Sequence, residues 1–551
     1  MLSPQRTLSR SGWNAAIFII FVEVAERFAY YGLVGNLIMY LTNELHLPTA
    51  TAAKNVNMWI GLSSLFPILG AIVADSYLGR FKTIIYSTCI YFLGMVMLCL
   101  SASVVPWHYR GGAYFVALYI LAVGEGGHKP CVQTFAADQF DEVTDEDKEV
   151  KSSFFNWWYL AIVFTAIVAT LGIIYIQDDV SWVLSYGVLA VIIAAGLVLF
   201  LLGMQRYRYE DNLLVGASPL TMVAQVFVAA ARKWRVRLGH RNDVVYYGDD
   251  ESGSSGVDSK HKTLARTKQF RFLDKAMIVD EHDASSKMRN PWRLCSLNQV
   301  EEVKLVVRLI PVWLSCLMFH AVQSQLHTYF IKQGSTMIRS IGPKFRFPPA
   351  SLQAVVGIMI VTTVLIYDRI IVPTARKVTG HPAGITVLQR IGVGLFLSII
   401  NMVVAALVEA KRVGVARDYN LMDNPKAIVP ISVWWLLSQF IVTGLSDAFT
   451  VVGLQELFYD QMPDAMRSLG AAAYISILGV GSFLSSFIIS LVETFSRNSG
   501  ELWLGNNLNR AHLDDFYWLL AGLSALFFGV YLWVANRFVY KKVAGVASNE
   551  V

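Results

Sequence analysis

Long apolar stretches recur along the whole chain and predict its architecture. Each is about 20 residues or more, enough for a helix to cross the hydrocarbon core of a bilayer. We count twelve, near residues 14–42, 52–75, 82–104, 112–139, 153–177, 181–204, 300–331, 349–372, 384–410, 430–457, 468–493 and 514–540. Together with a content of 55% hydrophobic and 16% charged residues over 551 positions, the pattern predicts an all-α polytopic membrane protein.

A polar segment divides these stretches into two sets of six. The sequence therefore predicts an N-terminal six-helix bundle over 1–204, a linker over 205–299 and a C-terminal six-helix bundle over 300–551. Within the linker, a run that opens at Ser218-Pro219 and ends in Arg232-Lys233-Trp234-Arg235 predicts an amphipathic helix lying on an anionic leaflet. The following residues, 248–258, are rich in Asp, Ser and Gly and are predicted to be disordered.

The distribution of basic residues indicates which side the termini occupy. Arg6 and Arg10 precede the first stretch, Arg80 and Lys82 follow the second, and the outside loops of this half contain only Arg110. Lys and Arg accumulate on the cytoplasmic side, so the termini and the linker are predicted to be cytoplasmic. The second half departs from this rule, because the outside loops predicted near 332–346 and 411–426 carry eight Lys and Arg.

The first apolar stretch contains three charged residues, Glu23, Glu26 and Arg27. Each such charge costs about 2.5–3.5 kcal/mol at the bilayer centre even on the lowest scale, and intramembrane charges usually mark ion or proton pathways. Their spacing of i, i+3 and i+4 places them on one helical face. Two acids that compete for one arginine can take up and release a proton, although a structural ion-pair knot between helices remains an alternative.

The fourth stretch contains a second polar group within the run Gly-Glu-Gly-Gly-His-Lys-Pro-Cys over 124–131. Its glycines and Pro130 favour close helix approach and a kink. Lys129 is an intramembrane cation that needs an anionic partner, either a glutamate of the first stretch or a substrate carboxylate. Glu125 could be a pore acid or the partner of Lys129, and His128 could as well be a packing residue.

The run over 23–32, Glu-Val-Ala-Glu-Arg-Phe-Ala-Tyr-Tyr-Gly, closely resembles the signature of the proton-dependent oligopeptide transporters. The chain is also similar to their plant branch, the nitrate and peptide transporter family, and residues 70–82 resemble the loop signature of the major facilitator superfamily. Further similar stretches follow in the family's order at 126–131, 154–159, 271–276, 292–295, 348–352, 367–369, 388–392 and 507–514.

This resemblance implies a major facilitator fold with twelve transmembrane helices, a long cytoplasmic central loop and a cavity alternately open to each side. It implies that Glu23, Glu26 and Arg27 couple protons, and that Lys129 pairs with them or with an anionic substrate. It also places Asp447 in the cavity, where peptide-transporting relatives hold the peptide's amino end. Asp is one methylene shorter than the commoner Glu, which leaves its reach in question.

Three more positions bear on the substrate. Gln323 aligns with a histidine that holds nitrate in a relative, and a neutral amide cannot become an imidazolium, so nitrate bound in that mode is disfavoured. Tyr30 and Tyr31 could line a pocket for an organic solute, or they could simply pack between helices.

The sequence thus predicts a proton-coupled symporter of a small solute such as a peptide, nitrate, a hormone or a glycosylated metabolite. A nutrient-sensing transceptor that signals through the linker is the alternative. The chain has no HExxH, nucleophile-elbow or Walker-type motif, so neither enzymatic activity, a metal nor another cofactor is expected. The expected partners are the solute, protons and lipid, without nucleic acid; a homo-oligomer and the choice between plasma and vacuolar membrane stay open.

Overall fold

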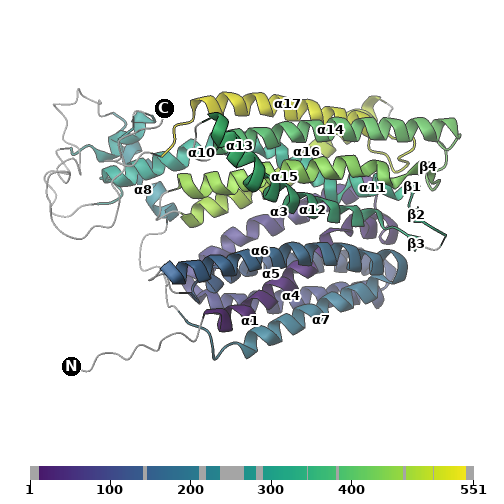
Figure 1. Cartoon of the computed structure of the whole chain (residues 1–551), viewed down its shortest axis with the longest axis horizontal. Coiled ribbons are helices and arrows are strands. Elements are labelled where there is room, and N and C mark those ends of the chain that lie inside the picture. The colour runs from purple at the N-terminus through teal and green to yellow at the C-terminus, as the bar shows by residue number, and fades with distance from the viewer. Residues whose placement is uncertain are drawn as a thin grey trace. The chain divides into compact units, whose positions relative to one another are not determined.

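The computed structural model describes residues 12–140, 145–209, 219–235, 266–267, 269–280, 290–343, 345–379, 384–462, 467–499 and 502–541. Most of these residues are helical (Figure 1). The α-helices are α1 (Gly12–Val34), α2 (Leu37–Met39), α3 (Thr49–Val73), α4 (Arg80–Ser103), α5 (Trp107–Ala137), α6 (Asp145–Tyr175), α7 (Trp182–Leu202), α8 (Pro219–Arg232), α10 (Leu297–Gln323), α11 (Tyr329–Ser335), α12 (Gln353–Ile366), α13 (Val372–Thr379), α14 (Val387–Asp418), α15 (Leu437–Gln461), α16 (Arg467–Ser499) and α17 (Leu513–Arg537).

Four short strands lie between the helices of the second half. They are β1 (Met337–Ile338), β2 (Ser340–Ile341), β3 (Phe345–Arg346) and β4 (Val429–Ser432). Strand β1 pairs in parallel with β4, and β2 pairs in antiparallel with β3.

The predicted all-α membrane fold is confirmed. In the part of the chain that the structure describes, ten helical segments are long and apolar enough to cross a membrane. Helices α1 and α5 are not among them, although they lie at the first and fourth predicted spans. These two helices carry the charged residues of the proposed site, Glu23, Glu26 and Arg27 on α1 and Glu125 and Lys129 on α5, and these charges lower their hydropathy.

The seventh predicted span is not one continuous helix. Helix α10 ends at Gln323, a 3-10 turn covers Ser324–His327, and α11 begins at Tyr329. Thr328 between them has φ −127° and ψ −96°, far from helical values. The break places Gln323 at the very end of α10.

The described residues form two compact units. The first takes its residues from Met1–Leu213, Cys316–Gly453 and Ile475–Gly529, and the second from Leu214–Ser315, Leu454–Tyr474 and Val530–Val551. All the residues that the sequence proposes for the site therefore belong to the first unit.

Close packing around α5 organises the first half of the first unit. Helices α3 and α4 pack on α5, while α6 and α7 pack on α1 (Figure 1). A Cβ at Gly124 would lie 2.7 Å from the backbone nitrogen of Tyr91, and one at Gly126 would lie 2.7 Å from the Cβ of Phe66. Only glycine permits these approaches, as the sequence predicts for this run, and they let α5 pack closely against α4 and α3.

The second unit contains the predicted linker helix, α8. Its buried residues Val226, Ala229 and Ala230 lie on a helix that packs against the 3-10 helix Arg271–Met277. Lys233 follows α8 and is only 2% exposed, with its ammonium 2.6 Å from the carbonyl oxygen of Ile278. The basic end of the segment is thus partly inside the protein, because Lys233 is buried while Trp234 is 65% exposed. The placement of this helix on an anionic leaflet stays a prediction. Residues 248–258, predicted to be disordered, lie outside the described residues.

Candidate functional site

Three charged side chains of α1 lie together inside the first unit. Arg27 Nε is 2.8 Å from Glu23 Oε1 and 3.3 Å from Glu26 Oε2. Glu23 is 5% exposed and Glu26 is 1% exposed. The predicted shared face is therefore right, and one guanidinium serves both carboxylates.

Helix α5 contributes a second ion pair. Lys129 Nζ binds Glu125, one turn earlier on the same helix, and Glu125 is fully buried. The same ammonium lies 4.6 Å from the ring centre of Tyr30, which adds a cation–π contact. Of the partners left open by the sequence, the structure favours Glu125; among the described residues, no α1 carboxylate is in ion-pair distance of Lys129.

His128 links the two helices. Its ring is completely buried, and Nδ1 lies 3.8 Å from Glu23 Oε2. The sequence reasoning ranked this residue below Lys129, because a lone histidine in an apolar helix often only packs. Its position directly before Lys129 was the available signal.

Aromatic side chains border the same cluster. Tyr30 stacks on Trp59 at a centroid distance of 5.8 Å and meets Tyr31 edge-on at 5.5 Å. Tyr91 of α4 is buried, and its backbone lies against Gly124 of α5, next to Glu125. Sequence reasoning missed Tyr91, because nothing in α4 marks that position as lying next to the polar residues of α5.

Several polar atoms of the cluster make no hydrogen bond within the described protein. They are Glu23 Oε2, both carboxylate oxygens of Glu26 and of Glu125, and both ring nitrogens of His128. Buried polar atoms are nearly always hydrogen-bonded, so these atoms are free to bind a proton, water or solute. The ligand atoms of Glu23, Glu26 and His128 also lie within 4.8 Å of one another, but a metal there would have to compete with Arg27.

Asp447 and Gln323 form a separate polar pair in the second half. The amide Nε2 of Gln323, at the end of α10, donates to Asp447 Oδ1 on α15. In the described part of the chain no cation lies in ion-pair distance of Asp447. Nor does a described contact join this pair to the cluster of α1 and α5, so the structure brings the predicted site residues together as two groups.

Comparisons with known proteins agree with this architecture. The sequence profile described as "PTR2: POT family" matches residues 81–504. "Protein NRT1/ PTR FAMILY 5.4" of Arabidopsis thaliana is 57% identical over 537 residues, covering 97% of this chain and 96% of that protein. "Protein NRT1/ PTR FAMILY 5.10" of the same plant is 46% identical over 557 residues, covering 98% and 95%.

Solved structures share the fold at low sequence identity. An auto-inhibited POT family peptide transporter superimposes with a TM-score of 0.69 at 18% identity, covering 97% of this chain and 99% of that one. A POT family transporter in complex with 5-aminolevulinic acid gives a TM-score of 0.65 at 14% identity, covering 96% and 98%. Profile, relatives and fold agree along nearly the whole length: this chain belongs to the POT family of membrane transporters, rather than to any family of enzymes, and is similar within it to the plant NRT1/PTR proteins.

Proposed function

We propose that the protein is a proton-coupled secondary active transporter, a symporter that moves a small solute by alternating access. The observation that carries this proposal is the buried group formed by Glu23, Glu26 and Arg27. Two carboxylates share one guanidinium inside a membrane-spanning helix, so protonation of one transfers Arg27 to the other. Such an exchange couples proton binding to a side-chain rearrangement.

The proton gradient supplies enough energy for accumulation. One proton that moves down a potential of ~100 mV releases about 2.3 kcal/mol, and one pH unit adds about 1.4 kcal/mol. The sum sustains a solute gradient of several hundred-fold.

Two ion pairs and a hydrogen bond between the N-terminal and C-terminal halves support alternating access. Lys54 Nζ lies 2.6 Å from Glu493 Oε2, and Arg339 Nη1 lies 2.8 Å from Asp178 Oδ2. Gln353 Nε2 also donates to the carbonyl of Gly35 at 2.7 Å. In the first half these ties involve the start of α3 and residues just after α1 and α6, which is the side predicted to face outward. They fit a state closed on the outside, and opening requires their rupture.

The substrate site we propose includes Lys129, Asp447, Gln323, Tyr30 and Tyr31. One relative in the fold comparison is a peptide transporter, and another holds 5-aminolevulinic acid; peptides and this acid both carry an amino group and a carboxylate. The Asp447 carboxylate suits the amino group. Lys129 suits the carboxylate, which must then compete with Glu125. No specific observation favours the sensing alternative.

Uptake by proteoliposomes that contain the purified full chain tests the proposal. The panel is nitrate, di- and tripeptides, and 5-aminolevulinic acid, each with and without an inward proton gradient. We expect at least one solute to accumulate above its equilibrium level only when the gradient is present, and to carry protons inward. Accumulation that ignores the gradient for every accepted solute would overturn proton coupling.

A further inference from the structure

We propose that His128 and Glu125 extend the proton site, so that the resting cluster holds one extra proton that Glu23 and His128 share. This inference rests on the proposed function and adds residues to its mechanism. It concerns the α1 and α5 cluster alone, because the Gln323–Asp447 pair makes no described contact with it.

The charge count of the cluster requires the extra proton. Three carboxylates, those of Glu23, Glu26 and Glu125, face two permanent cations, Arg27 and Lys129. All three acids are 5% exposed or less. With a neutral imidazole the buried group therefore carries one uncompensated negative charge, which is strongly unfavourable away from water. One bound proton removes the imbalance.

The other described cations of α4 and α5 do not remove it. Arg80 pairs with Asp138, Lys82 is exposed, and Arg110 lies over Trp107 in the first turn of α5. Helix α1 contributes Tyr30 and Tyr31 to the surroundings of the cluster, and α4 contributes Tyr91. Tyrosine is neutral at physiological pH. In the described part of α3, the charged residue Lys54 forms an ion pair with Glu493, so α3 supplies no positive charge to balance the cluster.

The geometry points to Glu23 and His128 as the pair that shares the proton. The two oxygens of Glu23 face different partners, because Oε1 binds Arg27 at 2.8 Å and Oε2 lies 3.8 Å from His128 Nδ1. Neither ring nitrogen of His128 makes a hydrogen bond within the described protein. At 3.8 Å the two atoms are too far apart for a hydrogen bond, so a shared proton must draw them together. A proton on Nδ1 then gives an imidazolium–carboxylate pair, and a proton on Oε2 gives a neutral hydrogen-bonded pair. Either form leaves Arg27 free to move toward Glu26.

Glu125 is the third carboxylate of the cluster, and its negative charge is the one that the extra proton compensates. It holds Lys129 and is fully buried. Without its charge, the cluster contains two acids and two cations and is neutral without any added proton. Glu125→Gln should therefore lower the affinity of the cluster for protons, whereas His128→Gln should remove one of the two groups that share the proton.

Infrared titration of the reconstituted full chain tests this inference without a substrate. The readout is the C=O band of protonated carboxyl groups together with imidazole bands as pH is varied. In the wild type we expect the carboxyl C=O band and the imidazole bands to change together, in one step of the titration. In Glu125→Gln the midpoint of that step should shift by about one pH unit toward acid, since removal of a nearby like charge favours the ionised form. In His128→Gln the imidazole component of that step should disappear.

A surface pair provides the matched control. His512 Nδ1 lies 3.7 Å from Asp515 Oδ2, nearly the same separation as in the buried pair, but the two side chains are 42% and 48% exposed. His512→Gln should leave the midpoint unchanged. If Glu125→Gln and His128→Gln both titrate like this control while remaining monodisperse, the inference is wrong. If Glu125→Gln shifts the midpoint and His128→Gln loses the imidazole component, but wild-type uptake ignores the proton gradient, the proposed symport fails and the shared proton stands.

Discussion

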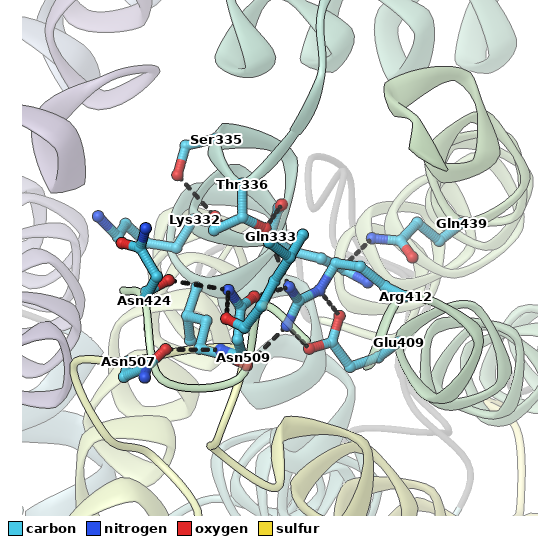
Figure 2. Close-up of polar contacts among 12 residues, drawn as sticks. Lys332, Gln333, Ser335, Thr336, Glu409, Arg412, Asn424, Gln439, Asn507 and Asn509 are labelled. Carbon is cyan, nitrogen blue, oxygen red and sulfur yellow. Dashed lines mark hydrogen bonds and ion pairs between the residues drawn. The ribbon is translucent and has the colours of Figure 1, made fainter. Parts of the chain in front are cut away.

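Two buried charged groups in the first unit differ in how completely their polar atoms are satisfied. Around Arg412 on α14 (Figure 2), the guanidinium binds Glu409 through two bonds, Nε to Oε2 at 2.8 Å and Nη2 to Oε1 at 2.6 Å. It also donates to Asn509 Oδ1 at 2.7 Å and to the Leu508 carbonyl at 2.7 Å. Both charged side chains are fully buried. One carboxylate pairs with one guanidinium, and neighbouring oxygen atoms accept hydrogen bonds from the remaining guanidinium N–H groups.

The contacts of Asn509 extend this network, which we call the Arg412 network. Its amide Nδ2 lies 3.2 Å from the carbonyl oxygens of Leu421 and of Asn424, and Arg412 Nη1 reaches Thr336 at 3.2 Å (Figure 2). The network thereby joins α14 to the segments around β1 and before α17. The cluster of α1 and α5 has instead three acids for two permanent cations and many atoms without hydrogen bonds.

This difference teaches that burial alone does not distinguish a structural ion pair from a functional one. Fully paired charges fix one arrangement, whereas surplus acids and unmet hydrogen-bonding capacity allow several arrangements of similar energy. The first kind makes the fold sensitive to single substitutions, because removal of one partner leaves a buried unpaired charge. The second kind suits proton exchange.

The largest effect should follow from breaking the Arg412 network. Arg412→Met leaves the Glu409 carboxylate buried without a partner, so we expect a loss of roughly 3–5 kcal/mol in the free energy of unfolding. Thermal melting followed by size-exclusion chromatography measures it. The matched control is Arg412→Met with Glu409→Gln, which removes both charges and should recover much of the loss. Equal stability of the single variant and the wild type would contradict a structural role.

A change in the other group should spare the fold and abolish coupling. Glu26→Gln removes one of the acids that compete for Arg27, and the α1 and α5 cluster then needs no extra proton. We expect proton-driven accumulation to fall to the equilibrium level, while counterflow exchange persists. Melting should shift far less than in Arg412→Met. Uphill transport at the wild-type rate by Glu26→Gln would contradict the assigned role.

Local patterns in the sequence were sufficient to predict the membrane helices and the α1 group. Apolar runs determine the helices, and the i, i+3, i+4 spacing of Glu23, Glu26 and Arg27 fixes their shared face. The pairing of Lys129 with Glu125 was open at that stage, because an i+4 partner and a partner on another helix fit the same sequence. Only the side-chain positions in the structure, with Lys129 Nζ on Glu125, decide between them.

Contacts between residues far apart in the chain could not be predicted. Gln323 and Asp447 are 124 positions apart, and both were placed in the site without any indication that they bind each other. Arg412 was assigned to an outside loop, but α14 continues to Asp418. Arg412 therefore lies on a helix and pairs with Glu409 inside the protein, rather than standing in a loop.

A smaller effect is expected when Lys129 is released. Glu125→Gln removes the carboxylate that holds the ammonium, so anionic solutes should bind about 5- to 10-fold more tightly, equivalent to about 1–1.4 kcal/mol. Neutral solutes should be unaffected. Competition binding of a carboxylate solute and its amide analogue measures the difference, and an equal change for both would count against contact of Lys129 with substrate.

The smallest effect should come from an ion pair in the same loop as Asn509. Arg510 Nη2 lies 2.9 Å from Asp423 Oδ1, but the side chains are 68% and 80% exposed. Water already solvates both charges, so Arg510→Ala should change the free energy of unfolding by less than about 0.5 kcal/mol. Asp423→Ala should behave alike in the same melting assay. Because Arg510 directly follows a residue of the Arg412 network, a loss as large as that of Arg412→Met would mean that the loop, rather than the buried charge, stabilises this region.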